Sequence, residues 1–99
     1  MKINIQYVHM ATSEAMSDYV QERLEKLGNK FDFIIAAEVH FQVEHNDKTK
    51  GKICKIELSL PGPRIFATSN EDNYEDAVKN TIKDLEKQLK KRKKVLKPH

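Results

Sequence analysis

The sequence is poor in the residues on which disulfide-bonded domains and phosphate-loop enzymes depend. Its 99 residues include one cysteine, three glycines and three prolines. Cys54 has no partner for an internal disulfide or a cysteine-based zinc site, and its position in an alternating apolar run predicts a small buried side chain. With three scattered glycines, the chain contains no glycine-rich loop of the kind that cradles phosphates.

Long apolar runs are also missing. No segment approaches the roughly 18–20 consecutive apolar residues of a membrane-spanning helix. The first ten residues, MKINIQYVHM, alternate between apolar and polar side chains and lack the continuous apolar stretch of a signal peptide. We therefore expect a cytoplasmic protein with no membrane partner. The length predicts a single domain that spans residues 1–99.

The spacing of apolar residues predicts a strand and then a helix in the first third of the chain. A two-residue period over residues 2–8 indicates a half-buried strand with its isoleucines on one face. The helix that follows has Thr12 or Ser13 as its N-cap and Gly28-Asn29 as its stop. Its apolar stripe consists of Met16, Tyr19, Val20, Leu24 and Leu27.

Three more strands follow in the middle of the chain. Strict alternation of apolar and polar residues predicts strands at 36–44 and 54–60, joined by a polar turn at 46–51. Pro61-Gly62-Pro63 ends the second of these, because proline cannot donate a hydrogen bond to a sheet. A shorter strand is expected at Arg64–Ser69, where the apolar positions alternate less cleanly.

A long amphipathic helix closes the chain. Asp72 as the N-cap and Glu75 three residues later resemble a capping box, and the helix should run to about Lys93. The predicted order of elements is therefore β-α-β-β-β-α. Because both helices have an apolar face to cover, we expect a single α+β domain, in which a four-stranded sheet carries two helices on one face.

Positive charge is concentrated in this last helix. Residues 83–97 hold eight basic and two acidic side chains, although the net charge of the whole chain is only +3. Helical geometry places five lysines within a sector of roughly 80° opposite the apolar stripe. They are Lys79, Lys83, Lys87, Lys90 and Lys94. Such a row can follow a phosphate backbone through salt-dependent contacts, and a solvated lysine face is the simpler alternative.

The first helix adds a smaller basic set. Arg23, Lys26 and Lys30 recur at three- and four-residue steps along the edge of its apolar stripe. If the two helices lie side by side, these residues would widen the positive surface. A solvated rim around the core is the alternative interpretation.

Nothing in the pattern of polar residues indicates catalysis. The four histidines lack the spacing of metal ligands, and the carboxylates fall mainly on helix exteriors and in turns. Ser59, Ser69 and Cys54 have no recognisable base partner. We therefore predict a protein that is not an enzyme and that needs neither a metal nor another cofactor.

Several segments match, in order, the pattern of one known family. They are Met1–Gln6, Thr12–Met16, Tyr19-Val20, Leu24–Leu27, Phe31-Asp32, Val39–Glu44 and Leu85–Leu89 followed by Lys91. On these segments, which cover essentially the whole chain, the sequence resembles the short ribosome hibernation promoting factors. The same family contains protein Y and the sigma-54 modulation proteins.

The resemblance implies a fold similar to double-stranded RNA-binding domains and a role on the ribosome. Family members bind the small ribosomal subunit in the channel that mRNA and tRNA occupy at the A and P sites. They contact 16S rRNA mainly through basic residues of the two helices and block translation sterically, in stationary phase or stress. Short members help whole ribosomes pair into inactive dimers with a second hibernation factor.

The end of the chain bears on which branch of the family it resembles. The sequence stops at Lys97-Pro98-His99, whereas protein Y has an extended acidic tail and long members carry a further domain. We therefore expect the dimer-promoting branch. We also expect the free protein to be a monomer.

The resemblance and the lysine row together give the predicted RNA-binding residues. Lys26, Lys87 and Lys91 match basic positions of the family. Helical geometry adds Arg23, Lys30, Lys79, Lys83, Lys90 and Lys94. The chain departs from the family at Lys83-Asp84, where the usual order is Asp-Lys, and at Tyr74–Val78. The family glycine after the first strand is also absent near Tyr7. These departures indicate a divergent member.

Two other functions fit the same basic helix. One is a protein-interaction module, such as a sigma-factor modulator, that docks the helix on an acidic partner. The other is a general double-stranded RNA-binding domain. The second is disfavoured because the N-terminus of the last helix is acidic and would repel phosphate. Its acidic residues are Glu71, Asp72, Glu75 and Asp76.

Overall fold

The computed structural model describes residues 1–45 and 50–96. Its elements follow the predicted order. They are β1 (Lys2–Tyr7), α1 (Glu14–Lys30), β2 (Ala36–Val43), β3 (Lys52–Ser59), β4 (Ile65–Glu71) and α2 (Tyr74–Leu96). Most of the predicted turn at 46–51 and the tail at 97–99 lie outside the described residues. Within the described part of the chain, no helix combines the length and the apolar character that crossing a membrane requires.

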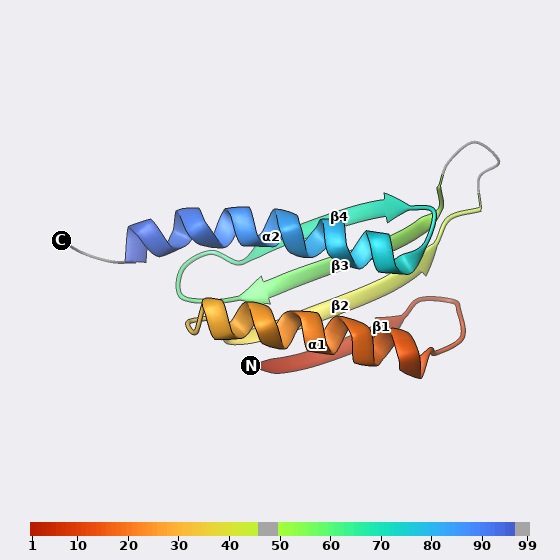
Figure 1. Cartoon of the computed structure of the whole chain (residues 1–99), viewed down its shortest axis with the longest axis horizontal. Helices are drawn as coiled ribbons and strands as arrows, with labels where there is room; N and C mark the ends of the chain where they lie inside the picture. The colour runs from red at the N-terminus through yellow and green to blue at the C-terminus, as the bar shows by residue number, and fades with distance from the viewer. Residues whose placement is uncertain (46–49, 97–99) are drawn as a thin grey trace.

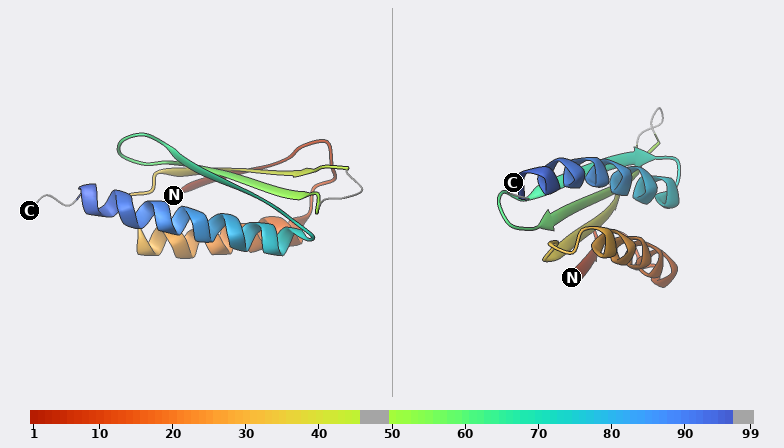
Figure 2. Two further views of the ribbon diagram at one scale, coloured as in Figure 1. Left: turned by 90° about the horizontal axis from the view of Figure 1, so that it is seen from above. Right: turned by 60° about the vertical axis from the view of Figure 1, so that its left-hand side comes forward.

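The four strands form one sheet in the order β1-β2-β3-β4. β1 pairs in parallel with β2, because α1 carries the chain back along the sheet between them, whereas β2, β3 and β4 form an antiparallel meander. Both helices cover the same face of the sheet and lie side by side, with their N-termini at the same end (Figures 1 and 2). This arrangement confirms the predicted α+β fold, and none of the described residues places a helix on the other sheet face.

The core lies between the sheet and the two helices. Alternate residues of β2 and β3 point into it as predicted, and Val39, Phe41 and Cys54 are completely buried. The ring of Phe41 stacks on Tyr7 with their centroids 5.2 Å apart, and it meets Tyr74 edge-on at 5.5 Å. The helices contribute the predicted apolar stripes, chiefly Val20, Leu24, Leu27, Ala77, Val78, Ile82, Leu85 and Leu89.

Burial determines the chemistry of the single cysteine. Desolvation raises the pKa of the Cys54 thiol to about 12, although a hydrogen bond with Thr81 acts in the opposite direction. We expect the native protein at pH 8 to resist labelling by Ellman's reagent, and the denatured protein to label fully. Because the unfolded thiol ionises near its ordinary pKa of about 9, burial of the neutral thiol stabilises the fold below that pH. This contribution to the free energy of unfolding is lost as the pH rises from about 9 to 12. Rapid labelling of the native protein at pH 8 would contradict the burial of this thiol.

The start of α1 confirms the prediction, and its end does not. The Oγ of Ser13 accepts a hydrogen bond from the amide of Met16 at 3.2 Å, as an N-cap should. The predicted stop at Gly28-Asn29 is wrong, because the helix continues to Lys30. A Cβ on Gly28 would lie 2.6 Å from Cε of Met1, so this glycine makes room for a neighbouring side chain and does not end the helix.

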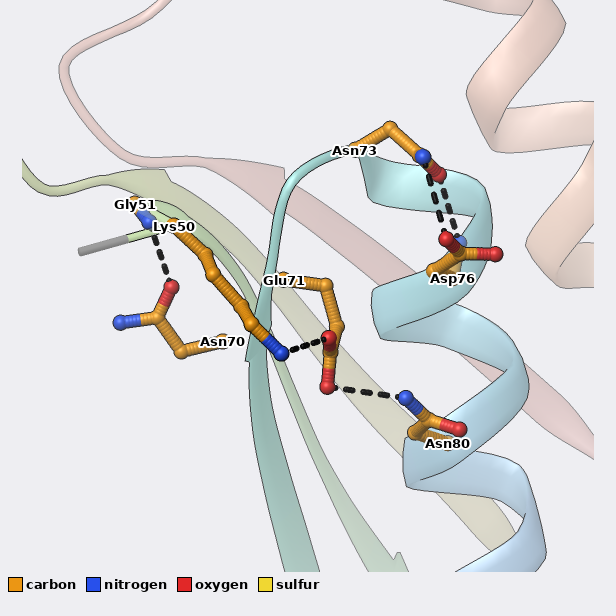
Figure 3. Close-up of polar contacts among 7 residues, drawn as sticks. All are labelled: Lys50, Gly51, Asn70, Glu71, Asn73, Asp76 and Asn80. Atoms are coloured by element: carbon orange, nitrogen blue, oxygen red, sulfur yellow. Dashed lines mark hydrogen bonds and ion pairs between the residues drawn. The ribbon is translucent and has the colours of Figure 1, made fainter.

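The predicted N-cap of α2 is one residue too early. Asn73, not Asp72, caps the helix: its Oδ1 accepts from the amide of Asp76 at 2.8 Å, and its Nδ2 donates to Oδ2 of Asp76 at 3.1 Å (Figure 3). Asp72 and Asn73 are both good N-cap residues, and each has an acid three positions later, so the sequence alone does not separate them. The helix ends at Leu96, three residues beyond the predicted Lys93.

Removing this cap should cost stability. We expect Asn73→Ala to lower the free energy of unfolding by about 0.5–2 kcal/mol, because the amide of Asp76 would lose its acceptor. The neighbouring substitution Asp72→Ala should change it by no more than about 0.5 kcal/mol. Urea unfolding followed by circular dichroism measures both, and equal losses would place the cap elsewhere.

Polar side chains tie the start of β3, at the turn end of the β2–β3 hairpin, to α2. The Nζ of Lys50 lies 2.8 Å from Oε1 of Glu71, whose other oxygen accepts from Nδ2 of Asn80 in α2 at 2.8 Å (Figure 3). Gly51 has a φ of +85°, and a Cβ there would lie 2.5 Å from the carbonyl oxygen of Glu44. The position therefore requires glycine.

The edge strand β4 differs slightly from the prediction. It runs from Ile65 to Glu71, so it starts one residue later and ends two residues later than expected. Ile65 and Ala67 are buried, whereas Phe66 lies on the outer face of the sheet with 70% of its surface exposed. The outward Phe66 explains why the alternation in this segment is hard to recognise.

Candidate nucleic-acid interface

The predicted lysine row forms an exposed stripe along α2. Its members are Lys79, Lys83, Lys87, Lys90 and Lys94, and all five side chains are exposed. The core residues of α2, such as Leu85 and Leu89, point the other way and are completely buried. At a rise of 1.5 Å per residue, this lysine stripe is about 22 Å long.

The basic residues of α1 lie on the side of that helix that faces α2. Lys30 bridges the two helices, with its Nζ 3.0 Å from Oε2 of Glu86. Arg23 is half-buried, and its guanidinium lies 5.8 Å from the centre of the Tyr19 ring. Lys26 is exposed and pairs with Glu22 of its own helix at 3.4 Å. The helices do lie side by side, which is the condition under which these residues were expected to widen the positive surface.

A shallow groove follows the line between the two helices. It consists of two adjoining hollows of about 210 and 370 Å³ that share Arg23, Ile82 and Glu86. Lys26 and Lys30 line the first hollow, and Lys79 and Lys83 line the second. The fold therefore gathers five of the predicted site residues around this interhelix groove. They are Arg23, Lys26, Lys30, Lys79 and Lys83.

The other predicted residues lie farther along α2. The C-terminal part of this helix extends past the end of α1 (Figure 1). Lys87, Lys90 and Lys94 continue the lysine stripe along it. Lys91 follows Lys87 by four residues and widens the stripe on the side away from α1. The basic residues of the predicted segment at 83–97 are thus exposed as far as they are described, apart from the half-buried Arg92, and Lys97 lies outside the described residues.

Two basic residues of the same segment have a different role. The Nη1 of Arg92 donates to the carbonyl oxygen of Pro61 at 2.9 Å, and the Nζ of Lys93 lies 5.9 Å from the centre of the Phe31 ring. A Cβ on Gly62 would lie 3.0 Å from the Arg92 guanidinium, so a small residue at this turn suits the contact. These contacts hold the C-terminal part of α2 against the β3–β4 loop and the end of α1. Sequence reasoning did not assign Arg92 and Lys93 this anchoring role.

One acidic side chain lies within the basic surface. Glu86 is half-buried, and its Oε2 lies 3.0 Å from Nζ of Lys30 and 3.7 Å from Nζ of Lys90. The hydrogen bond from Lys30 is the main cause that lowers the pKa of this carboxyl, with smaller contributions from the charges of both lysines. Glu86 is therefore ionised at neutral pH. Among the described residues, it is the only acid that lines the interhelix groove.

The N-terminal end of α2 is negative, as the sequence indicates. Asp72, Glu75 and Asp76 are exposed there, beside the half-buried Glu71. Hydrogen bonds from Lys50 and then from Asn80 lower the pKa of Glu71, so this carboxyl also stays ionised (Figure 3). A phosphate would be repelled at this end. The positive surface therefore begins at Lys79 and not at the N-terminus of the helix.

The described residues offer little for other chemistries. No group of three or more histidine, cysteine or acidic side chains among them is placed to hold a metal ion. The outer face of the sheet carries charges of both signs, including an ion pair of 3.2 Å between Arg64 and Glu57. Clustered positive charge is thus a property of the helical side.

Comparison with known proteins identifies related sequences along nearly the whole chain. The family model described as "Sigma 54 modulation protein / S30EA ribosomal protein" matches residues 3–97. A Pseudomonas putida protein named ribosome hibernation promoting factor is 30% identical over 93 residues, which cover 94% of this chain and 87% of that protein. A Bacillus subtilis protein named ribosome hibernation promotion factor is 30% identical over 97 residues, which cover 94% of this chain but 49% of that protein.

A solved structure agrees with the fold. A ribosomal subunit interface protein from Coxiella burnetii superposes with a TM-score of 0.81 at 26% sequence identity. The match covers 94% of this chain and 98% of that one. The likeness therefore includes both helices and all four strands.

Proposed function

The chain belongs to the Sigma 54 modulation protein / S30EA ribosomal protein family, which includes the ribosome hibernation promoting factors, and we propose that it silences translation by binding the small ribosomal subunit. Hibernation factors of this family are not enzymes. The proposed action is steric: the bound domain occupies the channel of mRNA and tRNA at the A and P sites. No chemical step and no cofactor are needed for this action.

The observation that carries the proposal is the positive surface made by both helices. Five of its residues gather around the interhelix groove, and the rest of the lysine stripe and Lys91 continue the positive surface along α2. Point charges spaced along two rigid helices suit the phosphate backbone of folded rRNA, because such contacts need no base-specific geometry. The proposed rRNA contacts are Arg23, Lys26, Lys30, Lys79, Lys83, Lys87, Lys90, Lys91 and Lys94.

The proposal has consequences for the protein's partners and state. The partners are the small subunit, through 16S rRNA, and whole ribosomes, which the protein inactivates in stationary phase or stress. Ribosomes would then pair into inactive dimers with the help of a second hibernation factor. The protein acts in the cytoplasm, as a monomer before it binds, and residues 1–99 form the single ribosome-binding domain.

Affinity capture from a bacterial extract tests the kind of partner. An immobilised chain should retain small-subunit rRNA at about 0.1 M salt and release it as the salt is raised, because phosphate contacts are salt-dependent. Ribonuclease treatment of the extract should remove the ribosomal proteins from the captured material. Capture of one acidic protein that survives ribonuclease would instead support the protein-interaction module, and would contradict the proposal.

A further inference from the structure

Glu86 lies at the point where the two basic helices meet. Its carboxylate is bound by Lys30 of α1 and by Lys90 of α2, at 3.0 and 3.7 Å. The same residue lines both hollows of the interhelix groove, next to Arg23. Cations from two elements thus converge on one anion in the middle of a positive surface.

We propose that the carboxylate of Glu86 engages the cations of a phosphate site and so mimics the ligand of that site in the free protein. The ligand is a phosphodiester group of the bound RNA, which would take over Lys30 and Lys90 when the domain binds. This inference rests on the proposed function. The surrounding cations then provide the affinity of this surface for RNA, and Glu86 limits it.

The exposure of the three side chains fits such an exchange. The side chain of Glu86 is 26% exposed, whereas those of Lys30 and Lys90 are 64% and 66% exposed. The lysines can therefore turn toward an incoming phosphate while Glu86 stays in place. Ion pairs with so much exposure contribute little to stability, so breaking them costs little.

An alternative role for Glu86 is a structural tie between the helices. The interface does not need that tie, because Leu27 of α1 and Ile82 of α2 line the same groove and are both buried. Apolar burial of this kind holds helices together more strongly than an exposed ion pair. The Lys30–Glu86 pair is therefore better explained as a substitute for the contact between Lys30 and an RNA phosphate.

The substitution Glu86→Gln tests the phosphate site. It keeps the shape of the side chain and removes its charge, so Lys30 and Lys90 become available. We expect affinity for purified small subunits to rise roughly three- to tenfold at 0.1 M salt, because one like charge about 5 Å from a phosphate is removed. The plot of log affinity against log salt should become steeper by about one, since no carboxylate freed from Lys30 remains to take up a salt cation when the phosphate binds.

A matched control is Glu57→Gln on the outer face of the sheet. It also removes one negative charge and releases one cation, Arg64, from a pair of 3.2 Å. This variant should bind small subunits within about twofold of the wild type, because the charge lies far from the groove. A gain equal to that of Glu86→Gln would show an effect of net charge alone and would contradict the inference.

Glu86→Gln could strengthen binding by releasing Lys30 or only by removing the repulsion between Glu86 and the phosphate. A second substitution separates these two effects. Lys30→Gln should weaken binding little in the wild type, where the cost of breaking the Lys30–Glu86 pair offsets the phosphate contact, and at least about threefold more in the Glu86→Gln background. If the wild type binds but Glu86→Gln binds equally or more weakly, the phosphate site is wrong. If the wild type fails to bind small subunits at all, the proposed function is wrong.

Discussion

Replacing Lys87, Lys90 and Lys91 together by glutamate should abolish binding to the small ribosomal subunit and leave the fold intact. All three side chains are exposed, and the 3.7 Å pair of Lys90 with Glu86 contributes little to stability. The three reversals replace three phosphate attractions by three repulsions. At about 1 kcal/mol for each charge contact, affinity should fall by at least roughly 100-fold at 0.1 M salt.

The control for this variant carries the same change of charge on the other side of the molecule. Lys2, Lys55 and Arg64 are exposed on or beside the sheet face that has no helix, and their reversal to glutamate should leave most of the binding. Co-sedimentation with small subunits measures binding, and thermal melts followed by circular dichroism measure folding. A folded Lys87/Lys90/Lys91 variant that binds like the wild type, or a control variant that loses binding equally, would overturn the assignment of the helical face.

Phe41→Ala should destabilise the domain more than any surface change. Phe41 is completely buried and contacts the rings of both Tyr7 and Tyr74, so truncation removes its own apolar burial and opens a cavity. A loss of about 3–5 kcal/mol is expected. This is a large part of the total free energy of unfolding, which is about 5–15 kcal/mol for such domains. Each loss of about 1 kcal/mol lowers the melting temperature of a domain of this size by about 4 °C or more, so the melting temperature should fall by at least about 12 °C.

A second phenylalanine in the same sheet is the matched control. Phe66 lies on the outer face with 70% of its surface exposed. Phe66→Ala should change the free energy of unfolding by no more than about 0.5 kcal/mol, because the ring gains little from burial. Chemical denaturation of both variants measures the difference. Equal losses would contradict the arrangement of the two sheet faces.

Periodic segments of the chain were the most predictable part of the fold. Side chains such as Val39 and Ile56 alternate with polar residues, and this two-residue period directly reflects which face of a strand is buried. The ends of the helices depend on less regular signals. Gly28 suggests a helix stop but accommodates Met1, a contact between segments far apart in the chain that periodicity cannot reveal.

The site was predictable to the extent that it depends on one helix. The lysine stripe of α2 follows from helical geometry alone. The interhelix groove depends on how α1 packs beside α2, so Glu86 looks like an ordinary exposed helix residue in the sequence. Arg92 looks like one more cation of the basic segment, and only its contact with the carbonyl of Pro61 assigns it to anchoring α2.

Sucrose-gradient sedimentation of purified ribosomes with and without the protein tests the central claim most directly. The protein should travel with small subunits and with whole ribosomes at moderate salt, and should leave them as the salt is raised. A faster peak of paired ribosomes, in the presence of a second hibernation factor, would support the dimer-promoting role. A protein that remains at the top of the gradient even at low salt would contradict ribosome binding and, with it, the proposed role of the basic helical face.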